Sequence, residues 1–261
     1  MGWWGKIVGG GFGFMLGGPL GALMGMAAGH QFDKGLKITK LEPGNTERVQ
    51  MAFFTAVFSV MGYLAKADGT VSRSEIQMAE NIMGQMNLDE QQRKAAIDLF
   101  NQGKQSDFPL DEVLQQFKKE CHRRTNLLQM FLEILIATAY ADNSLDPSEH
   151  AALQNIAQQI GFSAAQLEQI INMVGAQQSY SQQSSSSSSS SNQPSLSQAY
   201  AVLGVDSEVS DSSLKKSYRR LMSQHHPDKL VAKGLPEEMI KLANQKTAEI
   251  KAAYEQIKKS R

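Results

Sequence analysis

The longest apolar stretch of the chain lies close to its N-terminus. No Asp, Glu, Lys or Arg occurs between residues 7 and 32. A helix over these positions would be about 39 Å long, which exceeds the roughly 30 Å hydrocarbon core of a bilayer. A cleaved signal peptide would have an apolar region of only about 7–15 residues. The pattern therefore predicts a retained single-pass transmembrane helix over residues 7–31, preceded by a tail of residues 1–6.

Glycine recurs at every fourth position within this stretch, so that GxxxG units overlap along it. The glycines of this row are Gly9, Gly13, Gly17, Gly21, Gly25 and Gly29. A row of this kind forms a groove along one helix face, and the groove allows a second helix to approach closely in lipid. The sequence therefore predicts a homodimer held through the transmembrane helix.

Basic residues predict the orientation of this helix. Lys6 alone precedes the stretch, whereas Lys34, Lys37 and Lys40 follow it. Lysines and arginines concentrate on the cytoplasmic side of membrane helices. The tail is therefore expected outside the cytoplasm, and the juxtamembrane residues 32–46 and all later residues are expected inside it.

The middle of the chain shows the 3-to-4-residue apolar spacing of amphipathic helices. One stripe consists of Phe53, Val57, Val60 and Leu64. Another consists of Ile76, Ala79, Ile82, Met83 and Met86. Further helices are predicted over residues 90–103, 110–123, 125–141, 148–160 and 164–174. The predicted fold class of the chain is all-α, with this helical domain over residues 47–175.

An acidic nine-residue segment occurs twice in the helical domain. Residues 67–75 (ADGTVSRSE) match residues 141–149 (ADNSLDPSE) at an offset of 74. The carboxylates that could hold a hard metal ion there are Asp68, Glu75, Asp142 and Glu149. The same positions also start helices, because Ser72 and Glu75 form a capping box and Asp146 precedes Pro147 as an N-cap. We favour helix punctuation and predict no metal and no cofactor.

These paired segments resemble those of the TerB tellurite-resistance domain, although the second copy has Asn143 in place of glycine. The resemblance implies an all-helical domain that takes part in interactions near membranes. The same resemblance implies metal binding as a further property, since some TerB-type domains bind metal.

The charge composition becomes informative only when the chain is divided into segments. The net charge is zero overall, but it is +2 over residues 1–43, −6 over residues 44–194 and +4 over residues 195–261. Bulk neutrality excludes a nucleic-acid binder identified by basicity, and no nucleic-acid partner is predicted.

Cys121 is the single cysteine, so no intrachain disulfide can form. Nothing around Cys121 builds a nucleophile site, and the chain is not predicted to be an enzyme.

Residues 176–194 are predicted to be a linker. Eight consecutive serines occupy positions 184–191, and the segment has no charge and no periodic apolar residue. Such a segment cannot recover the conformational entropy lost on ordering. The sequence therefore predicts that the C-terminal module is tethered to the helical domain without docking on it.

The C-terminal module, residues 195–261, is predicted to contain a helical hairpin. Leu214, Tyr218 and Leu221 mark the apolar side of its first long helix, and Ile250 and Ile257 belong to the second. The solvent side of the first helix carries Lys215, Lys216, Arg219 and Arg220. The sequence HHPDK, residues 225–229, forms the predicted connection between the two helices.

This module resembles the J domain of DnaJ-type co-chaperones, through AYAVLGV, LKKSYRRL, HPDK and EIKAAYEQI in that order. The resemblance implies that His226, Pro227 and Asp228 stimulate ATP hydrolysis by a DnaK-type chaperone. It further implies that the basic side of the first helix binds an acidic surface of that partner. Tyr218 and Lys229 are implied supporting positions.

The order of anchor, TerB-like domain, linker and J domain resembles the membrane-anchored J-domain co-chaperones of bacteria. The resemblance implies a regulatory protein of the inner membrane with a periplasmic N-terminus. Such a protein would direct DnaK to membrane-proximal clients, including envelope or capsule signalling. The alternative is a membrane stress-response scaffold whose TerB-like domain binds metal or a partner, with an auxiliary J domain.

Overall fold

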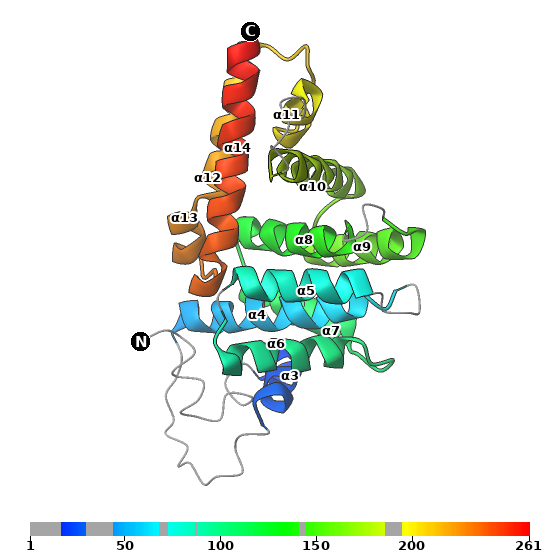
Figure 1. The fold of residues 1–261 in the computed structure, drawn as a ribbon. Helices are drawn as coiled ribbons and strands as arrows, with labels where there is room; N and C mark the ends of the chain where they lie inside the picture. The colour runs from blue at the N-terminus through cyan, green and yellow to red at the C-terminus, as the bar shows by residue number, and fades with distance from the viewer. Residues whose placement is uncertain (1–16, 30–43, 68–72, 87, 141–144, 186–194) are drawn as a thin grey trace.

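The computed structural model describes residues 17–29, 44–67, 73–86, 88–140, 145–185 and 195–261. Within these ranges the regular elements are all helices, and none of the described residues forms a strand (Figure 1). The predicted all-α fold class is therefore confirmed.

The TerB-like domain is built around one central helix, α4 (Asn45–Leu64), which is buried along most of its length (Figure 1). This burial follows from its sequence, because apolar residues occupy every side of the helix. The helices packed against it are α6 (Glu90–Gly103), α7 (Leu110–Glu120), α8 (Thr125–Ala139) and α9 (Pro147–Ile160), while α5 (Arg73–Gln85) and α10 (Ala164–Ser185) pack against α8. Their positions agree closely with those predicted from the apolar spacing, except that α10 continues beyond the predicted residue 174 to Ser185.

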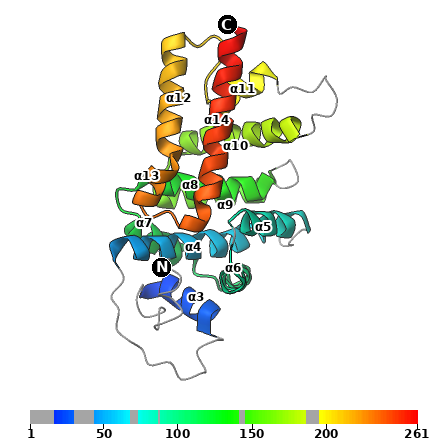
Figure 2. The same ribbon diagram turned by 60° about the vertical axis from the view of Figure 1, so that its left-hand side comes forward.

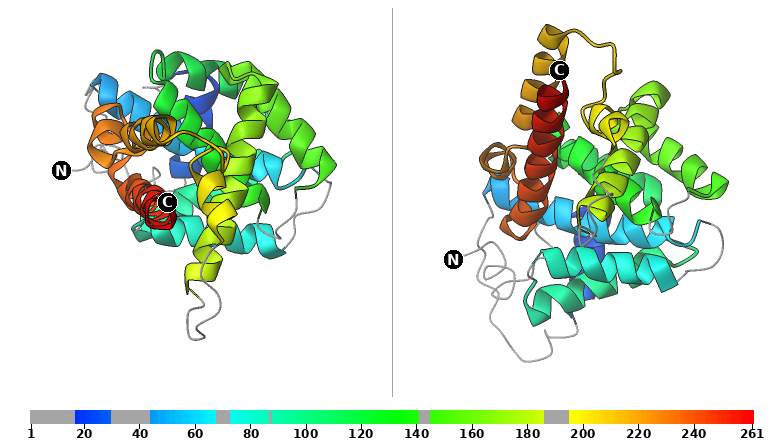
Figure 3. Two further views of the ribbon diagram at one scale, coloured as in Figure 1. Left: turned by 90° about the horizontal axis from the view of Figure 1, so that it is seen from above. Right: turned by 45° about the horizontal axis from the view of Figure 1, so that its top comes forward.

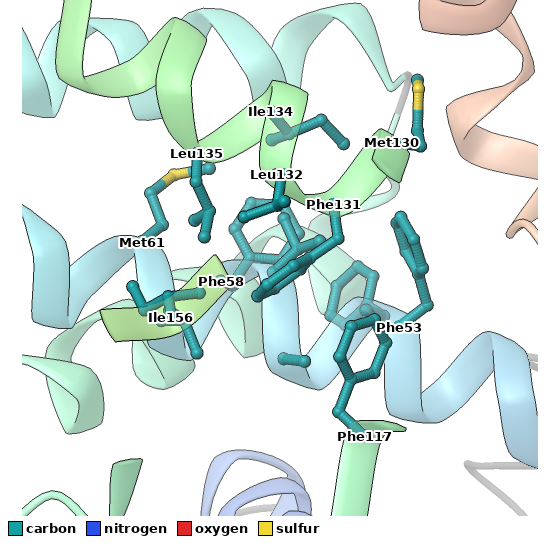
Figure 4. Close-up of a cluster of buried hydrophobic side chains, with 14 of the residues drawn as sticks. Phe53, Phe58, Met61, Phe117, Met130, Phe131, Leu132, Ile134, Leu135 and Ile156 are labelled. Carbon is teal, nitrogen blue, oxygen red and sulfur yellow. The ribbon is translucent and has the colours of Figure 1, made fainter. Parts of the chain in front are cut away.

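Aromatic side chains fill the centre of this domain (Figure 4). The Phe117 ring lies with its centroid 4.7 Å from that of Phe131 and 5.9 Å from that of Phe53. These three rings come from α7, α8 and α4, and all three are fully buried. The cluster therefore joins helices that are distant in sequence.

The second acidic segment starts a helix, as predicted. Asp146 accepts a hydrogen bond at Oδ1 from the backbone N–H of Ser148 (2.8 Å), and Glu149 accepts one at Oε2 from the backbone N–H of Asp146 (3.0 Å). Pro147 occupies the first turn, where its missing N–H costs nothing. Residues 68–72 and 141–144 lie outside the described residues, so Asp68, Asp142 and the first copy's cap remain predictions.

Helix α3 (Gly18–Gly29) carries the described part of the predicted transmembrane helix. In this structure it packs against the TerB-like domain, with Leu20 and Met24 fully buried. The side chain of Gln116 on α7 accepts a hydrogen bond from the backbone N–H of Leu20 (2.9 Å) and donates one to the carbonyl of Gly17 (2.8 Å). An apolar helix must be covered by lipid or by protein, and here helices α6 and α7 supply the cover.

Within the described ranges, no helix combines the length and apolarity that crossing a membrane requires. Gly17 and Gly18 have φ values of +60° and +62°, so α3 does not continue back through Gly17. Of the predicted glycine row, Gly21, Gly25 and Gly29 lie in α3, while Gly9 and Gly13 lie outside the described residues. Dimerisation through this row remains a prediction.

The C-terminal region contains the expected hairpin and two elements that were not expected. Its helices are α11 (Leu196–Val202), α12 (Asp211–His225), α13 (Pro227–Ala232) and α14 (Ile240–Ser260), with a 3-10 turn at Glu237–Met239. Helices α12 and α14 lie side by side in every view (Figures 1, 2 and 3). The short helix α13 and the 3-10 turn occupy the connection that the sequence had indicated as a loop.

The prediction that this region is tethered without docking is wrong. Leu230, Leu235 and Met239 are fully buried in the same apolar cluster as the TerB-like core. Helix α10 continues to Ser185, past the predicted domain end at residue 175. Residues beyond that end contact α14, because the Tyr180 hydroxyl donates to Gln256 Oε1 (3.0 Å). Contacts with the C-terminal region therefore supply the stabilisation that the composition of this segment lacks.

Two glycines allow α4 and α6 to cross at backbone contact. A Cβ atom added at Gly62 would lie 2.0 Å from the Phe100 carbonyl oxygen, and one at Gly103 would lie 1.8 Å from the Ser59 carbonyl oxygen. The neighbouring atoms are backbone, so they cannot turn aside. Glycine at both positions is thus a packing requirement despite its low helix propensity.

We predict that Gly62→Ala lowers the free energy of unfolding by about 1–3 kcal/mol, because the added methyl group must separate α4 from α6. Gly84→Ala is the matched control, since Gly84 also lies within a helix but nothing stands within 4 Å of its added Cβ. There the exchange should raise stability by about 0.5–1 kcal/mol. Urea denaturation measures both, and equal effects of the two substitutions would contradict the close crossing.

Candidate functional site

Helix α12 separates a buried side from a basic, exposed side. Its N-cap is Ser210, whose hydroxyl accepts a hydrogen bond from the backbone N–H of Ser213 (3.3 Å). The buried side consists of Leu214, Ser217, Leu221 and His225. The exposed side carries Lys215, Lys216, Arg219 and Arg220. We call these four residues the basic face.

The two predicted supporting residues lie on different sides of α12. Lys229 donates a hydrogen bond to the hydroxyl of Ser223 (2.7 Å), one turn beyond Arg219. Its ammonium group therefore extends the basic face toward the C-terminal end of the helix. Tyr218 instead stacks on Tyr254 of α14, with ring centroids 4.1 Å apart and an interplanar angle of 14°. Tyr218 thus holds the hairpin together.

His226 is the point at which the chain leaves one helix and enters the next. It has φ −59° and ψ 122°, outside the helical region, and Pro227 then occupies the first position of α13. The proline explains both observations, since its ring disfavours helical geometry in the preceding residue and its own φ suits a helix start. His226 and Asp228 are both exposed at this break. The predicted triad is therefore held in a defined turn beside the basic face.

The residue before this triad is buried against a carboxylate of the TerB-like domain. His225 Nε2 lies 3.4 Å from Glu133 Oε1, and Lys246 Nζ lies 2.7 Å from Glu133 Oε2. Glu133 is fully buried on α8, and Gln129 one turn earlier donates a hydrogen bond to its Oε1 (2.9 Å). Three helices thus meet at one buried ionic cluster, which joins the two domains.

The pKa values of this cluster move in the directions that its geometry implies. Burial would raise the pKa of Glu133, but His225, Lys246 and the hydrogen bond from Gln129 together bring it below its ordinary value. Burial lowers the pKa of His225, Glu133 opposes that effect, and the charges of Lys246 and Arg220 add to it. The lowered pKa of Glu133 keeps this carboxylate ionised at neutral pH, and the lowered pKa of His225 keeps its ring neutral.

Further hydrogen bonds connect the segment around the triad to the TerB-like domain. Asn126 Nδ2 donates to the carbonyl of Gln224 (3.0 Å), and Gln50 Nε2 donates to the carbonyl of Leu235 (3.4 Å). Sequence reasoning missed these contacts. One feature could have indicated them, because Glu133 is the single charged residue in the apolar helix over residues 125–139.

Among the described residues, no group of three His, Cys, Asp or Glu side chains is arranged to hold a metal ion. Glu149 is committed to its helix cap. Cys121 is buried, and this burial raises the pKa of its thiol to about 12. A thiol of that kind is protonated at neutral pH and is a poor nucleophile.

Comparison with known proteins agrees with this division of the chain. Residues 1–39 match the co-chaperone DjlA transmembrane domain, residues 54–172 match the tellurite resistance protein TerB family, and residues 198–261 match the DnaJ domain. Co-chaperone protein DjlA of Coxiella burnetii is 45% identical over 271 residues, which cover 100% of this chain and 99% of the relative. The chain belongs to the DjlA family of co-chaperones.

Other members of the DjlA family match over the same extent. The DjlA protein of Photobacterium profundum is 43% identical over 99% of both chains. That of Escherichia coli K12 is 42% identical over 100% of this chain and 99% of the relative. No solved structure matches the chain. The protein is therefore a membrane-anchored bacterial J-domain co-chaperone, and a DnaK-type chaperone is its partner.

We predict that acidification weakens the folded, docked protein through His225. Its pKa is lower in the folded protein than in the unfolded chain, so the unfolded chain binds more protons once the pH falls below about 6.5. The midpoint of thermal unfolding should fall between pH 7.5 and pH 5.5, and His225→Gln should reduce that fall. His150→Gln, at a partly exposed histidine paired with Glu168, is the control. Identical pH dependence of wild type and His225→Gln would contradict the assignment.

Proposed function

We propose that His226, Pro227 and Asp228 stimulate ATP hydrolysis by the DnaK-type chaperone. An acidic surface of that partner is bound by the basic face, Lys215, Lys216, Arg219 and Arg220, together with Lys229. Tyr218 supports the helix that carries the basic face. The observation that carries this proposal is the exposure of His226 and Asp228 at a proline-fixed break that continues the basic face. The triad acts by contact with the partner, and the hydrolytic chemistry belongs to the chaperone.

The charge of the C-terminal region supports binding of the basic face to an acidic partner. The region has a net charge of +4, and the basic face places the four positive charges of Lys215, Lys216, Arg219 and Arg220 on one side of α12. Such a surface accelerates encounter with an acidic partner and makes association sensitive to salt. His226 and Asp228 then offer hydrogen-bonding groups from a turn whose shape Pro227 restricts.

The N-terminal segment supports a proposed topology. A transmembrane helix over residues 7–31 places residues 1–6 in the periplasm and residues 32–261 in the cytoplasm, because Lys34, Lys37 and Lys40 follow the helix. The domain limits that accompany it are 47–175 for the TerB-like domain and 195–261 for the J domain, while the first part of the predicted linker, residues 176–194, belongs to α10. In this position the chain directs the chaperone to clients close to the membrane, including those of envelope or capsule signalling.

The glycine row supports a homodimer formed in the membrane. Gly9, Gly13, Gly17, Gly21, Gly25 and Gly29 recur at the spacing that permits close helix approach. A dimer would bring two J domains to one site, so that two chaperone molecules could act on one client.

We predict that His226→Gln abolishes stimulation of ATP hydrolysis while the fold is retained, because the exposed His226 side chain supports no part of the core. Single-turnover hydrolysis by DnaK with the full-length chain in detergent or liposomes measures this. His122→Gln, at another exposed histidine, is the matched control and should stimulate normally. Undiminished stimulation by His226→Gln would overturn the proposed mechanism.

We predict that Gly21→Ile together with Gly25→Ile weakens self-association in the membrane, since both side chains would fill the groove of the glycine row. An association assay in membranes, with residues 1–39 fused to a reporter, measures this. The control is Ala22→Ile, which lies within the same stretch outside the glycine register. An equal signal from the glycine variant and the wild type would contradict the dimer.

A further inference from the structure

The segment that carries the triad is anchored in the other domain. Leu230, the one fully buried side chain of α13, lies in the TerB-like cluster together with Leu235 and Met239. The remaining core of the C-terminal region is a separate cluster, which includes Leu214, Leu221 and Ile250. The residues that follow His226–Asp228 are therefore covered by the TerB-like domain, whereas most of the hairpin has a core of its own.

We propose that the TerB-like domain positions the triad, with Glu133 as the positioning residue that holds α12 and α14 in place. The docking part of this proposal stands by itself, and the effect on the chaperone rests on the proposed function. Glu133 does not touch the partner surface. It acts through Lys246 on α14 and through His225, the neighbour of His226.

The buried carboxylate of Glu133 favours the one arrangement of the two domains in which its partners are in place. Removing a carboxylate from water is costly, and an ion pair compensates only with good geometry and further hydrogen bonds. Lys246 meets that condition, since its Nζ lies 2.7 Å from Glu133 Oε2 and also donates to Gln177 Oε1 (2.9 Å). The main counter-charge of Glu133 therefore comes from the J domain, so burial of this carboxylate requires that the J domain be docked.

Docking leaves the partner surface open. The side of α12 that faces the TerB-like domain contains His225, whereas Lys215, Lys216, Arg219 and Arg220 lie on the opposite, exposed side. His226 and Asp228 also remain exposed in the docked protein. The docked state can thus meet the chaperone, and it does so with the triad in one orientation.

Undocking would expose Leu230, Leu235 and Met239 to water and deprive the segment after the triad of its cover. A segment without a fixed cover samples several conformations, and the fraction that is competent to activate the partner falls. The basic face would be unchanged by undocking. The structure therefore predicts that undocking lowers the maximal stimulation of hydrolysis and leaves the apparent affinity for the chaperone nearly constant.

The test uses the full-length chain with Lys246→Met, which leaves Glu133 without its ammonium partner. Lys251→Met on the same helix is the matched control, because Lys251 is exposed and its ion pair is with Glu255 of the same helix. The double variant Glu133→Gln/Lys246→Met removes both charges and should restore docking. Docking is read from the distance between spin labels at Gln154→Cys and Ser212→Cys, two exposed sites in different domains. The buried Cys121 thiol resists labelling.

Docking through Glu133 predicts a longer and broader distance distribution for Lys246→Met, with wild-type distributions for the control and the double variant. Positioning predicts that Lys246→Met lowers the maximal stimulation of DnaK several-fold at nearly unchanged apparent affinity, with recovery in the double variant. A wild-type distance in Lys246→Met would overturn docking through Glu133. If Lys246→Met separates the domains and still stimulates DnaK fully, the proposal that the TerB-like domain positions the triad is overturned. Failure of His226→Gln to reduce stimulation would overturn the proposed function instead, and the distances would still decide the docking.

Discussion

The carboxylate of Glu133 can be buried on α8 because two helices of the J domain bring compensating groups to it. Lys246 supplies the charge, and His225 closes the site from the other side. Without these groups the carboxylate would need water, and this need would oppose the docking that buries Leu230, Leu235 and Met239. The arrangement of the two domains therefore depends on this one ionic cluster. The polar contacts of Gln50 and Asn126 set the register around it.

This constraint connects the fold to the co-chaperone function. Helix α12 turns its buried side toward the protein and its basic face toward solvent, and the chain breaks at His226, where both surfaces end. Pro227 explains the break and the start of α13 in local terms, while the TerB-like core explains why α13 stays in place. This co-chaperone thus carries the segment that contains the proposed triad on the TerB-like core, in contrast to a module that moves freely at the end of a linker.

The sequence was sufficient for features that depend on local pattern. Helix positions followed from apolar spacing, the α9 cap from Asp146, Pro147 and Glu149, and the basic face from the spacing of Lys215 to Arg220. Docking was not predictable in this way, because it depends on contacts between residues such as Glu133 and Lys246 that are far apart in the chain. The predicted linker was judged by its composition alone, yet Gln177 and Tyr180 are ordered by α14. Helix α13 was overlooked although Pro227 is a known helix-start residue.

Docking brings the −6 region and the +4 region together through the ion pair of Glu133 with Lys246, and the basic face stays exposed to solvent. The most direct test is hydrogen–deuterium exchange on the full-length protein, followed at the amides of residues 228–239. A docked J domain predicts that the hydrogen-bonded amides of Leu230, Leu235 and Met239 are protected to a similar extent as those of the central helix α4, because all of them belong to one apolar cluster. Rapid exchange of these three amides, with α4 fully protected, would contradict the account.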